Sequence, residues 1–169
     1  ESGESLLKVL TRRLAETLGA KFAFIAAYDP SDSSGLIRSR AYWEDGKFGD
    51  PFVVPAEGTP CANVLEGCPT FYASGLRELF PADDFLKRIG AESYMGAPIF
   101  SRGKAVVGHV VIMHDAPLED DPGREWVLRV FGERAGVEME RLRQEALLRD
   151  QAGLIESAAD SIITVDFDG

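Results

Sequence analysis

The chain has 169 residues, of which 45% are hydrophobic, so it can bury one full core, and we expect one domain with flanking segments. Its formal net charge of -10 at pH 7 argues against a nucleic-acid partner and against contact with an anionic membrane, because both need a clustered cationic surface. No apolar run approaches the roughly 20 residues that span a bilayer, and the first residues do not read as a signal peptide, so we expect a cytoplasmic protein.

The first predicted element is a helix that ends at Gly19. Ser5 precedes a set of leucines at helical spacing, and glycine is a common helix terminator. An almost wholly apolar run over residues 21–28 then predicts a central strand that is covered on both faces. After a turn rich in Asp and Ser, residues 36–43 and 52–54 are two further strand candidates, separated by turn residues.

Short elements follow in the middle of the chain. Thr59 can cap a helix over residues 60–67, with proline at its first position and glycine at its end. Residues 70–73 predict a brief strand. A second short helix is expected between Pro81 and Gly90.

A hairpin and a long helix complete the predicted order. Residues 93–100 and 104–114 are strand candidates separated by a compact turn, so they should pair antiparallel. Asp121 and Pro122 then suit the N-cap and first position of a helix that we expect to run through Arg149.

Apolar residues of the long helix recur at steps of three, four or seven, which is typical of the seam of a bundle. They are Leu128, Ala135, Met139, Leu142 and Ala146. The alternative is simple packing across the domain's own sheet. Because the seam continues past the expected edge of the sheet, and the first helix has a matching stripe, we expect a homodimer through the N- and C-terminal helices.

Three segments resemble the GAF domain family of bacterial sensor proteins. They are GTPCANVLEG, LFPADDFLKRIGAESYMGAPIF and GKAVVGHVVIMHDAP, within residues 58–117. The resemblance implies an α+β fold, in which a central antiparallel sheet carries the N- and C-terminal helices on one face and short helices over a ligand pocket on the other. It also implies a GAF domain over residues 5–148.

The last stretch, LIESAADSIITVDFDG, predicts a helix that passes into a strand with nothing left to pair with. It resembles the opening of a PAS domain, a second sensory fold. We therefore expect residues 149–169 to be a linker helix and the first part of such a domain. The tandem is typical of histidine kinases of two-component systems, diguanylate cyclases and transcriptional regulators.

The resemblance leaves the ligand and any cofactor unidentified, because GAF domains bind cyclic nucleotides, haem, tetrapyrroles, amino acids and other small molecules. The constellation of the cyclic-nucleotide members is not traceable here. Cys61 and Cys68 do not lie in the motif of bilin-carrying members. These two cysteines are also too few for a structural zinc site unless His109 or His114 joined them, so we expect no metal.

The candidate ligand site follows from strand alternation and the resemblance. Tyr94 and Gly96 share one strand face. The resemblance implies that this face lines the pocket together with Ile112 and His114, under a roof of the two short helices. The expected ligand-binding residues are Cys61, Tyr72, Phe85, Tyr94, Gly96, Ile112 and His114.

Each of these residues also has a purely structural interpretation as core packing. His109, on the face opposite His114, is expected to donate a hydrogen bond to a backbone carbonyl. Cys61 lies in the first turn of a helix, whose dipole could lower a thiol pKa, but a buried small hydrophobic side chain is the simpler interpretation.

The leading hypothesis is a regulatory sensor module that binds an unknown small molecule and is not itself an enzyme. One alternative is a ligand-free dimerisation or spacer domain, whose cavity would be filled by Tyr72, Tyr94 and Phe85. Another is a GAF-fold reductase of free methionine sulfoxide with Cys61 or Cys68 as nucleophile. No catalytic carboxylate pair, phosphate loop or triad pattern supports further chemistry.

Overall fold

The computed structural model of the chain describes the backbone of residues 3–168 and the side-chain surroundings of residues 6–161. Its seven strands form one sheet in the order β3-β2-β1-β7-β6-β5, with β4 beside β2, and every pairing is antiparallel. The strands are β1 (Phe22–Tyr28), β2 (Leu36–Glu44), β3 (Lys47–Phe48), β4 (Val53–Pro55), β5 (Thr70–Tyr72), β6 (Ser93–Phe100) and β7 (Val106–His114).

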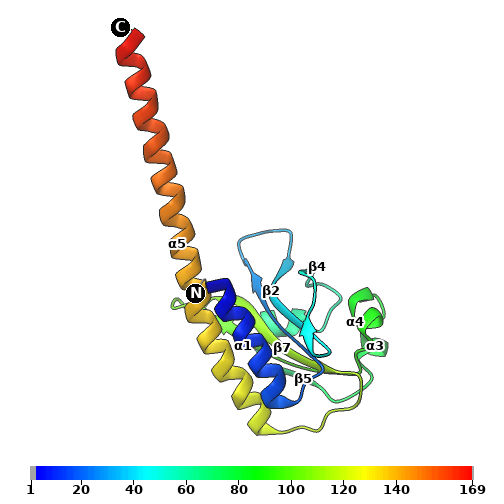
Figure 1. Cartoon of the computed structure of the whole chain (residues 1–169). Coiled ribbons are helices and arrows are strands. Elements are labelled where there is room, and N and C mark those ends of the chain that lie inside the picture. The colour runs from blue at the N-terminus through cyan, green and yellow to red at the C-terminus, as the bar shows by residue number, and fades with distance from the viewer. Residues whose placement is uncertain (1–2, 169) are drawn as a thin grey trace.

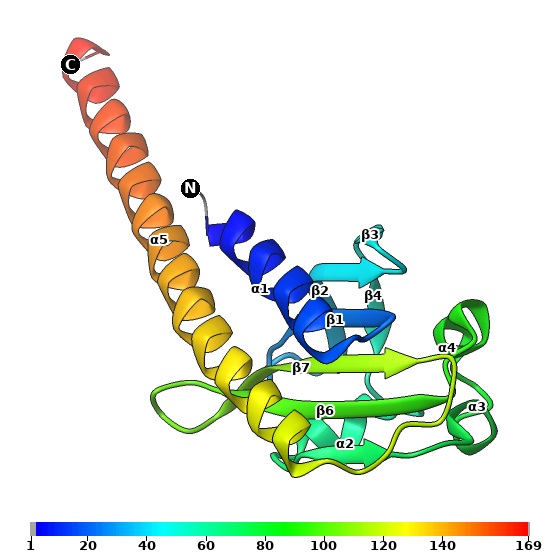
Figure 2. The same ribbon diagram turned by 60° about the horizontal axis from the view of Figure 1, so that its bottom comes forward.

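Two long helices cover one face of the sheet, and three short helices belong to the other face (Figure 1). The long helices lie next to each other, and the last one projects far beyond the sheet (Figure 2). The helices are α1 (Gly3–Leu18), α2 (Cys61–Leu65), α3 (Leu76–Leu79), α4 (Asp84–Ile89) and α5 (Pro122–Asp168).

Strand β1, at the centre of the sheet, has apolar side chains on both faces. Ala23 and Ile25 belong to the core beneath α1 and α5, whereas Phe22 and Phe24 belong to the core beneath the short helices. Because successive side chains of a strand point to opposite faces, an apolar run of this kind needs two covering layers. The expected α+β fold, with long and short helices on opposite faces of an antiparallel sheet, is confirmed.

Two short elements were not among the predicted ones. Strand β3 follows a tight turn in which Asp45 and Gly46 both have positive φ, 48° and 88°. A two-residue hairpin turn of type I′ requires this geometry, and Asp-Gly is its preferred sequence, so the sequence does carry a signal for β3. Helix α3 is a single turn that starts after Gly75, whose φ is 69°.

The predicted start of α5 is confirmed by its cap. The carboxylate of Asp121 accepts a hydrogen bond of 2.9 Å from the backbone amide of Gly123. The predicted strand near the C-terminal end is wrong, since the backbone stays helical through Asp168. A strand needs a neighbour to satisfy its backbone groups, and among the strands that the structure describes none lies beside this segment, whereas a helix satisfies its own backbone groups.

The predicted bundle seam of α5 largely packs on the domain's own sheet. Leu128 and Ala135 are fully buried in the core shared with α1, and Met139 and Leu142 pack partly against it. Ala146 is exposed. The assignment of this stripe as a dimer seam is therefore wrong for its first part, and intradomain packing explains it.

A different apolar stripe of α5 faces away from the sheet. Its side chains are between 43% and 70% exposed: Trp126, Val130, Val137, Leu148 and Ile155. Val130 and Val137 each lie two positions after a fully buried residue, which is about 200° around the helix axis. This helix therefore has apolar surface on two nearly opposite sides. Among residues 3–168 there is no helix with the length and apolar character needed to cross a bilayer.

Candidate functional site

A small cavity lies between the sheet and the short helices, where the predicted pocket was expected. Its volume is about 20 Å³, which is room for about one water molecule. Phe24 and Tyr94 contribute to its walls from the sheet, and Cys61, Asp83 and Phe85 contribute from α2 and α4 and the residue before α4.

Aromatic rings of the chain itself fill most of the space under the short helices. The ring centroid of Phe52 lies 5.2 Å from that of Phe24 and 4.8 Å from that of Phe85. Tyr42 lies 5.5 Å from both Phe52 and Phe85. These contacts have the edge-to-face or tilted geometry of stable aromatic pairs. The site is therefore closed in this conformation, and a ligand would have to displace rings of this cluster.

Tyr94 occupies the space that its neighbour Gly96 leaves open. Tyr94 is fully buried, and a Cβ atom on Gly96 would lie 2.8 Å from its hydroxyl oxygen and 3.0 Å from Cγ2 of Val64. Real Cβ atoms do not approach other atoms so closely. The room beside Gly96 therefore holds the chain's own tyrosine. Tyr72, also expected at the site, packs edge-on against Phe80, with ring centroids 5.3 Å apart.

Cys61 is a buried, protonated thiol. The Tyr94 hydroxyl donates a hydrogen bond of 3.4 Å to its Sγ atom. Burial raises the pKa of Cys61 to about 12, and this outweighs the stabilising hydrogen bonds from Tyr94 and Thr59. Burial therefore dominates the pKa of this thiol, and the side chain packs in the core beneath the short helices. Cys68 is exposed and also free.

The register of β6 and β7 corrects the expected lining. Tyr94 lies opposite Met113, and Met95 lies opposite Ile112. Residues directly opposite each other share a face, so Ile112 packs in the core beneath α1 and α5. His114, opposite Ser93, is also on that face. The expectation that Ile112 and His114 share the face of Tyr94 is therefore wrong, and Met113 lines the cavity instead.

His109 lies on the cavity side of the sheet, behind Phe24, with the two ring centroids 5.3 Å apart. It is fully buried, and neither ring nitrogen has a hydrogen-bond partner. Burial lowers its pKa to about 3, so the ring is neutral. The expected hydrogen bond to a backbone carbonyl is absent. Among the side chains that the structure describes, only the hydroxyl of Tyr42 shares this state of burial without a partner.

Sequence comparison with protein families matches residues 2–139 to the GAF domain, which is most of the chain. The chain belongs to the GAF domain family. The matched segment includes the sheet, the short helices and the part of α5 that packs on the sheet. A search of curated proteins found no match to this chain.

Solved structures of other proteins share its fold at low sequence identity. The GAF domain of a phosphoenolpyruvate-protein phosphotransferase from Coxiella burnetii is 21% identical, with a TM-score of 0.69, and covers 86% of this chain and 87% of its own. A phycoerythrobilin-bound GAF domain from a cyanobacterial phytochrome is 15% identical, with a TM-score of 0.64 and coverage of 85% and 88%. A domain assigned to a two-component sensor histidine kinase of Sinorhizobium meliloti 1021 is 16% identical, with a TM-score of 0.62 and coverage of 86% and 97%.

Proposed function

We propose that this GAF domain is the sensor module of a signalling protein. A small molecule binds between the sheet and the short helices, and α5 passes the bound state to a following domain. The observation that carries the proposal is the buried His109, which has no partner for either ring nitrogen. A buried polar group left unpaired costs about 1–3 kcal/mol, so its presence calls for a reason. A ligand that displaces Phe24 could supply the missing hydrogen bond.

The roof of the site is built to move more easily than the sheet. Helices α2 and α4 have five and six residues, and each contributes few buried side chains, such as Val64 of α2 and Leu86 of α4. Asp83, which caps α4 by accepting a hydrogen bond of 3.2 Å from the amide of Leu86, also lines the cavity. Elements with few buried apolar contacts open locally at low free energy. A shift of α4 would carry Phe85 away from Phe52.

Strand β6 connects the site to α5. Tyr94 lines the cavity, whereas Ile99 belongs to the core beneath α1 and α5. A Cβ atom on Gly136 of α5 would lie only 3.0 Å from Cγ2 of Ile99, so the helix and the strand are in close contact. A ligand that changes the twist of β6 would therefore change how α5 packs on the sheet. Coupling needs only that the ligand prefers one of the two arrangements.

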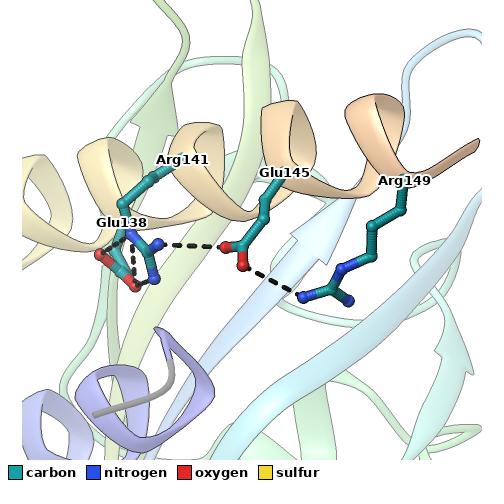
Figure 3. Close-up of polar contacts among 4 residues, drawn as sticks. All are labelled: Glu138, Arg141, Glu145 and Arg149. Atoms are coloured by element: carbon teal, nitrogen blue, oxygen red, sulfur yellow. Dashed lines mark hydrogen bonds and ion pairs between the residues drawn. The ribbon is translucent and has the colours of Figure 1, made fainter. Parts of the chain in front are cut away.

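An ion-pair ladder stiffens α5 where it leaves the domain (Figure 3). Arg141 lies 2.7 Å from Glu138 and 3.1 Å from Glu145, and Arg149 lies 3.1 Å from the other oxygen of Glu145. Pairs at three- and four-residue spacing stabilise a helix. We propose that residues 149–168, the last part of α5, link the GAF domain to a PAS domain in a cytoplasmic protein. The sensor histidine kinase domain with the same fold supports such a role.

We also propose that the working unit is a homodimer. The outward stripe from Trp126 to Ile155 advances in steps of 4, 7, 11 and 7 residues, each close to a whole number of helical turns, and in a parallel pair each of its residues meets its own copy. This contact would extend the C-terminal helices into a two-stranded rod, with α1 beside it.

A ligand-free spacer domain is the second candidate function. It is favoured by the small volume of the cavity, about 20 Å³, and by the aromatic rings that fill the site. A reductase with Cys61 as its nucleophile is disfavoured, since a nucleophilic cysteine needs a lowered pKa and that of Cys61 is raised to about 12.

Native mass spectrometry of the purified chain, combined with a thermal-shift screen of small molecules, tests these alternatives. A sensor should retain or bind a compound whose affinity falls in His109→Phe, which removes the ring nitrogens, and rises in Phe85→Ala, which removes one of the rings that the ligand must displace. Leu79→Ala is the matched control, because Leu79 is an exposed apolar residue of α3 and does not line the cavity. A dimer without extra mass, and with no hit that depends on His109 or Phe85, would support the spacer function instead.

A further inference from the structure

A second and larger concavity lies on the opposite face of the sheet, where α5 begins to leave it. Its volume is about 590 Å³, which is within the range of about 300–1,000 Å³ typical of small-molecule sites. It is bounded by α5, the β1–β2 loop and the β6–β7 loop. We call it the α5 wedge and define it by Ala27, Arg38, Ser101, Met139 and Arg143.

The floor of the α5 wedge is apolar. Met139, Leu142 and Ala146 continue the stripe of α5 whose earlier members are buried on the sheet. Val107 contributes from β7. Past Met139 the sheet no longer covers this stripe fully, so the wedge offers apolar surface that nothing else in the described chain buries.

Three arginines surround this floor. Arg38 and Arg40 come from β2, and Arg143 comes from α5. Within the described residues, none of the three forms a hydrogen bond or an ion pair. Hydrogen bonds from Ser31 lower the pKa of Asp29, and the positive charge of Arg143 lowers it further. Arg143 and Asp29 nevertheless do not form an ion pair.

The carboxylates of the wedge, in contrast, are already engaged. Asp29 accepts hydrogen bonds of 2.9 and 2.6 Å from the amide and hydroxyl of Ser31. Asp32 accepts one of 2.9 Å from the amide of Ser34. Glu140 accepts one of 3.4 Å from a side chain one turn further along α5. Hydrogen bonds therefore occupy one oxygen of each of these carboxylates, whereas the three guanidinium groups form none in the described part of the chain.

We propose that the α5 wedge binds a small organic oxyanion, either a carboxylate or a phosphate monoester, that carries a short apolar tail. Guanidinium groups recognise both oxyanions by paired hydrogen bonds, and the tail would cover the floor around Leu142. An oxyanion between Arg143 of α5 and Arg38 of β2 ties the helix to the sheet at its point of exit. This site is separate from the cavity beneath the short helices, and its existence does not depend on a ligand there.

The test is an NMR titration of the ¹⁵N-labelled chain with hexyl phosphate and, in a second arm, with hexanoate. Amide shifts are expected at Ala27, Val107 and Ala146, and the stronger ligand identifies the preferred oxyanion. Inorganic phosphate alone and hexanol alone should each bind more weakly, because each lacks one half of the recognition. Added salt should weaken binding of the charged probes.

Substitutions of single arginines by alanine, inside and outside the α5 wedge, test the role of the guanidinium groups. Arg38→Ala and Arg143→Ala should each weaken binding about tenfold, the expected effect of losing a charged hydrogen bond. Arg134→Ala, at an exposed position of α5 outside the wedge, should leave it unchanged. All three sites are exposed, so the amide spectra should confirm intact folds. The proposal is overturned if neither probe shifts the wedge amides at millimolar concentration, or if Arg134→Ala weakens binding as much as the other two.

Discussion

The hydroxyl of Tyr94 on β6 donates a hydrogen bond of 3.4 Å to Sγ of Cys61 in the first turn of α2. The bond joins the sheet to its roof, and both partners are buried. Because the pKa of Cys61 is raised to about 12, about one thiol in ten thousand is ionised at pH 8. In this conformation, Cys61 is therefore almost entirely in its protonated form.

The two cysteines should therefore differ sharply toward a thiol reagent. In the folded chain at pH 8, exposed Cys68 should react promptly, and Cys61 should react only as the domain opens. The absorbance of the product released by an aromatic disulfide reagent follows the reaction over time, and we expect one fast and one slow phase of one thiol each. Cys68→Ser should remove the fast phase. A fast phase that survives Cys68→Ser would show that Cys61 is accessible and ionisable.

Gly96→Ala should destabilise the fold because the new Cβ meets the ring of Tyr94. Overpacking of this kind costs about 1–3 kcal/mol. Gly103→Ala is the control, since a Cβ there would approach no atom closer than 3.8 Å. Urea unfolding measures both free energies of unfolding. Equal values for the two variants would mean that Tyr94 relaxes without cost.

His109 should make the folded state sensitive to acid. Its folded pKa of about 3 lies below the ordinary value of 6.5, so the unfolded chain binds the proton first and stability falls as the pH drops below 6.5. Between pH 7 and pH 5 this contributes a loss of about 2 kcal/mol. His109→Phe, which keeps an apolar ring in place, should remove that part of the loss. Urea unfolding of both proteins at the two pH values tests it, and identical pH dependences would contradict a buried neutral imidazole.

Arg141→Ala should destabilise the chain more than Arg149→Ala. Arg141 pairs with Glu138, whose side chain is only 8% exposed, whereas the partner of Arg149, Glu145, is 44% exposed. A carboxylate left unpaired in a shielded place costs about 1–3 kcal/mol, and a surface pair contributes about 0–1 kcal/mol. Thermal unfolding of the two variants gives the comparison. The reverse order would show that Glu138 reaches solvent once Arg141 is removed.

Charged substitutions in the outward stripe of α5 test whether this stripe forms the dimer contact. The double substitution Leu148→Lys with Ile155→Lys should convert a dimer into a monomer, because it places lysines opposite their own copies. Glu156→Lys is the control, at an exposed position of the same segment that is outside the stripe. Sedimentation velocity reports the outcome. A monomeric parent chain would contradict the dimer, and so would a double variant that remains dimeric.

Local patterns in the sequence were enough to predict the order of the larger elements, because their signals come from neighbouring residues. Gly19, the Asp121 cap and the hairpin turn between β6 and β7 each act within a few residues, and the apolar run of β1 requires cover on both faces whatever the rest of the chain does. The Asp45-Gly46 pair is a local signal of the same kind for the short strand β3. The resemblance to the GAF family added the arrangement of layers.

Which residues meet across the fold was decided by the tertiary structure alone. Alternation tells which side chains of a strand share a face, but only the register shows that Tyr94 faces Met113 and that Ile112 faces the long helices. In the same way, helical periodicity identifies the stripes of α5, but only packing shows that Leu128 is buried and Val137 is exposed. The unpaired state of His109 depends on groups from distant segments failing to reach it, and no local pattern in the sequence encodes that.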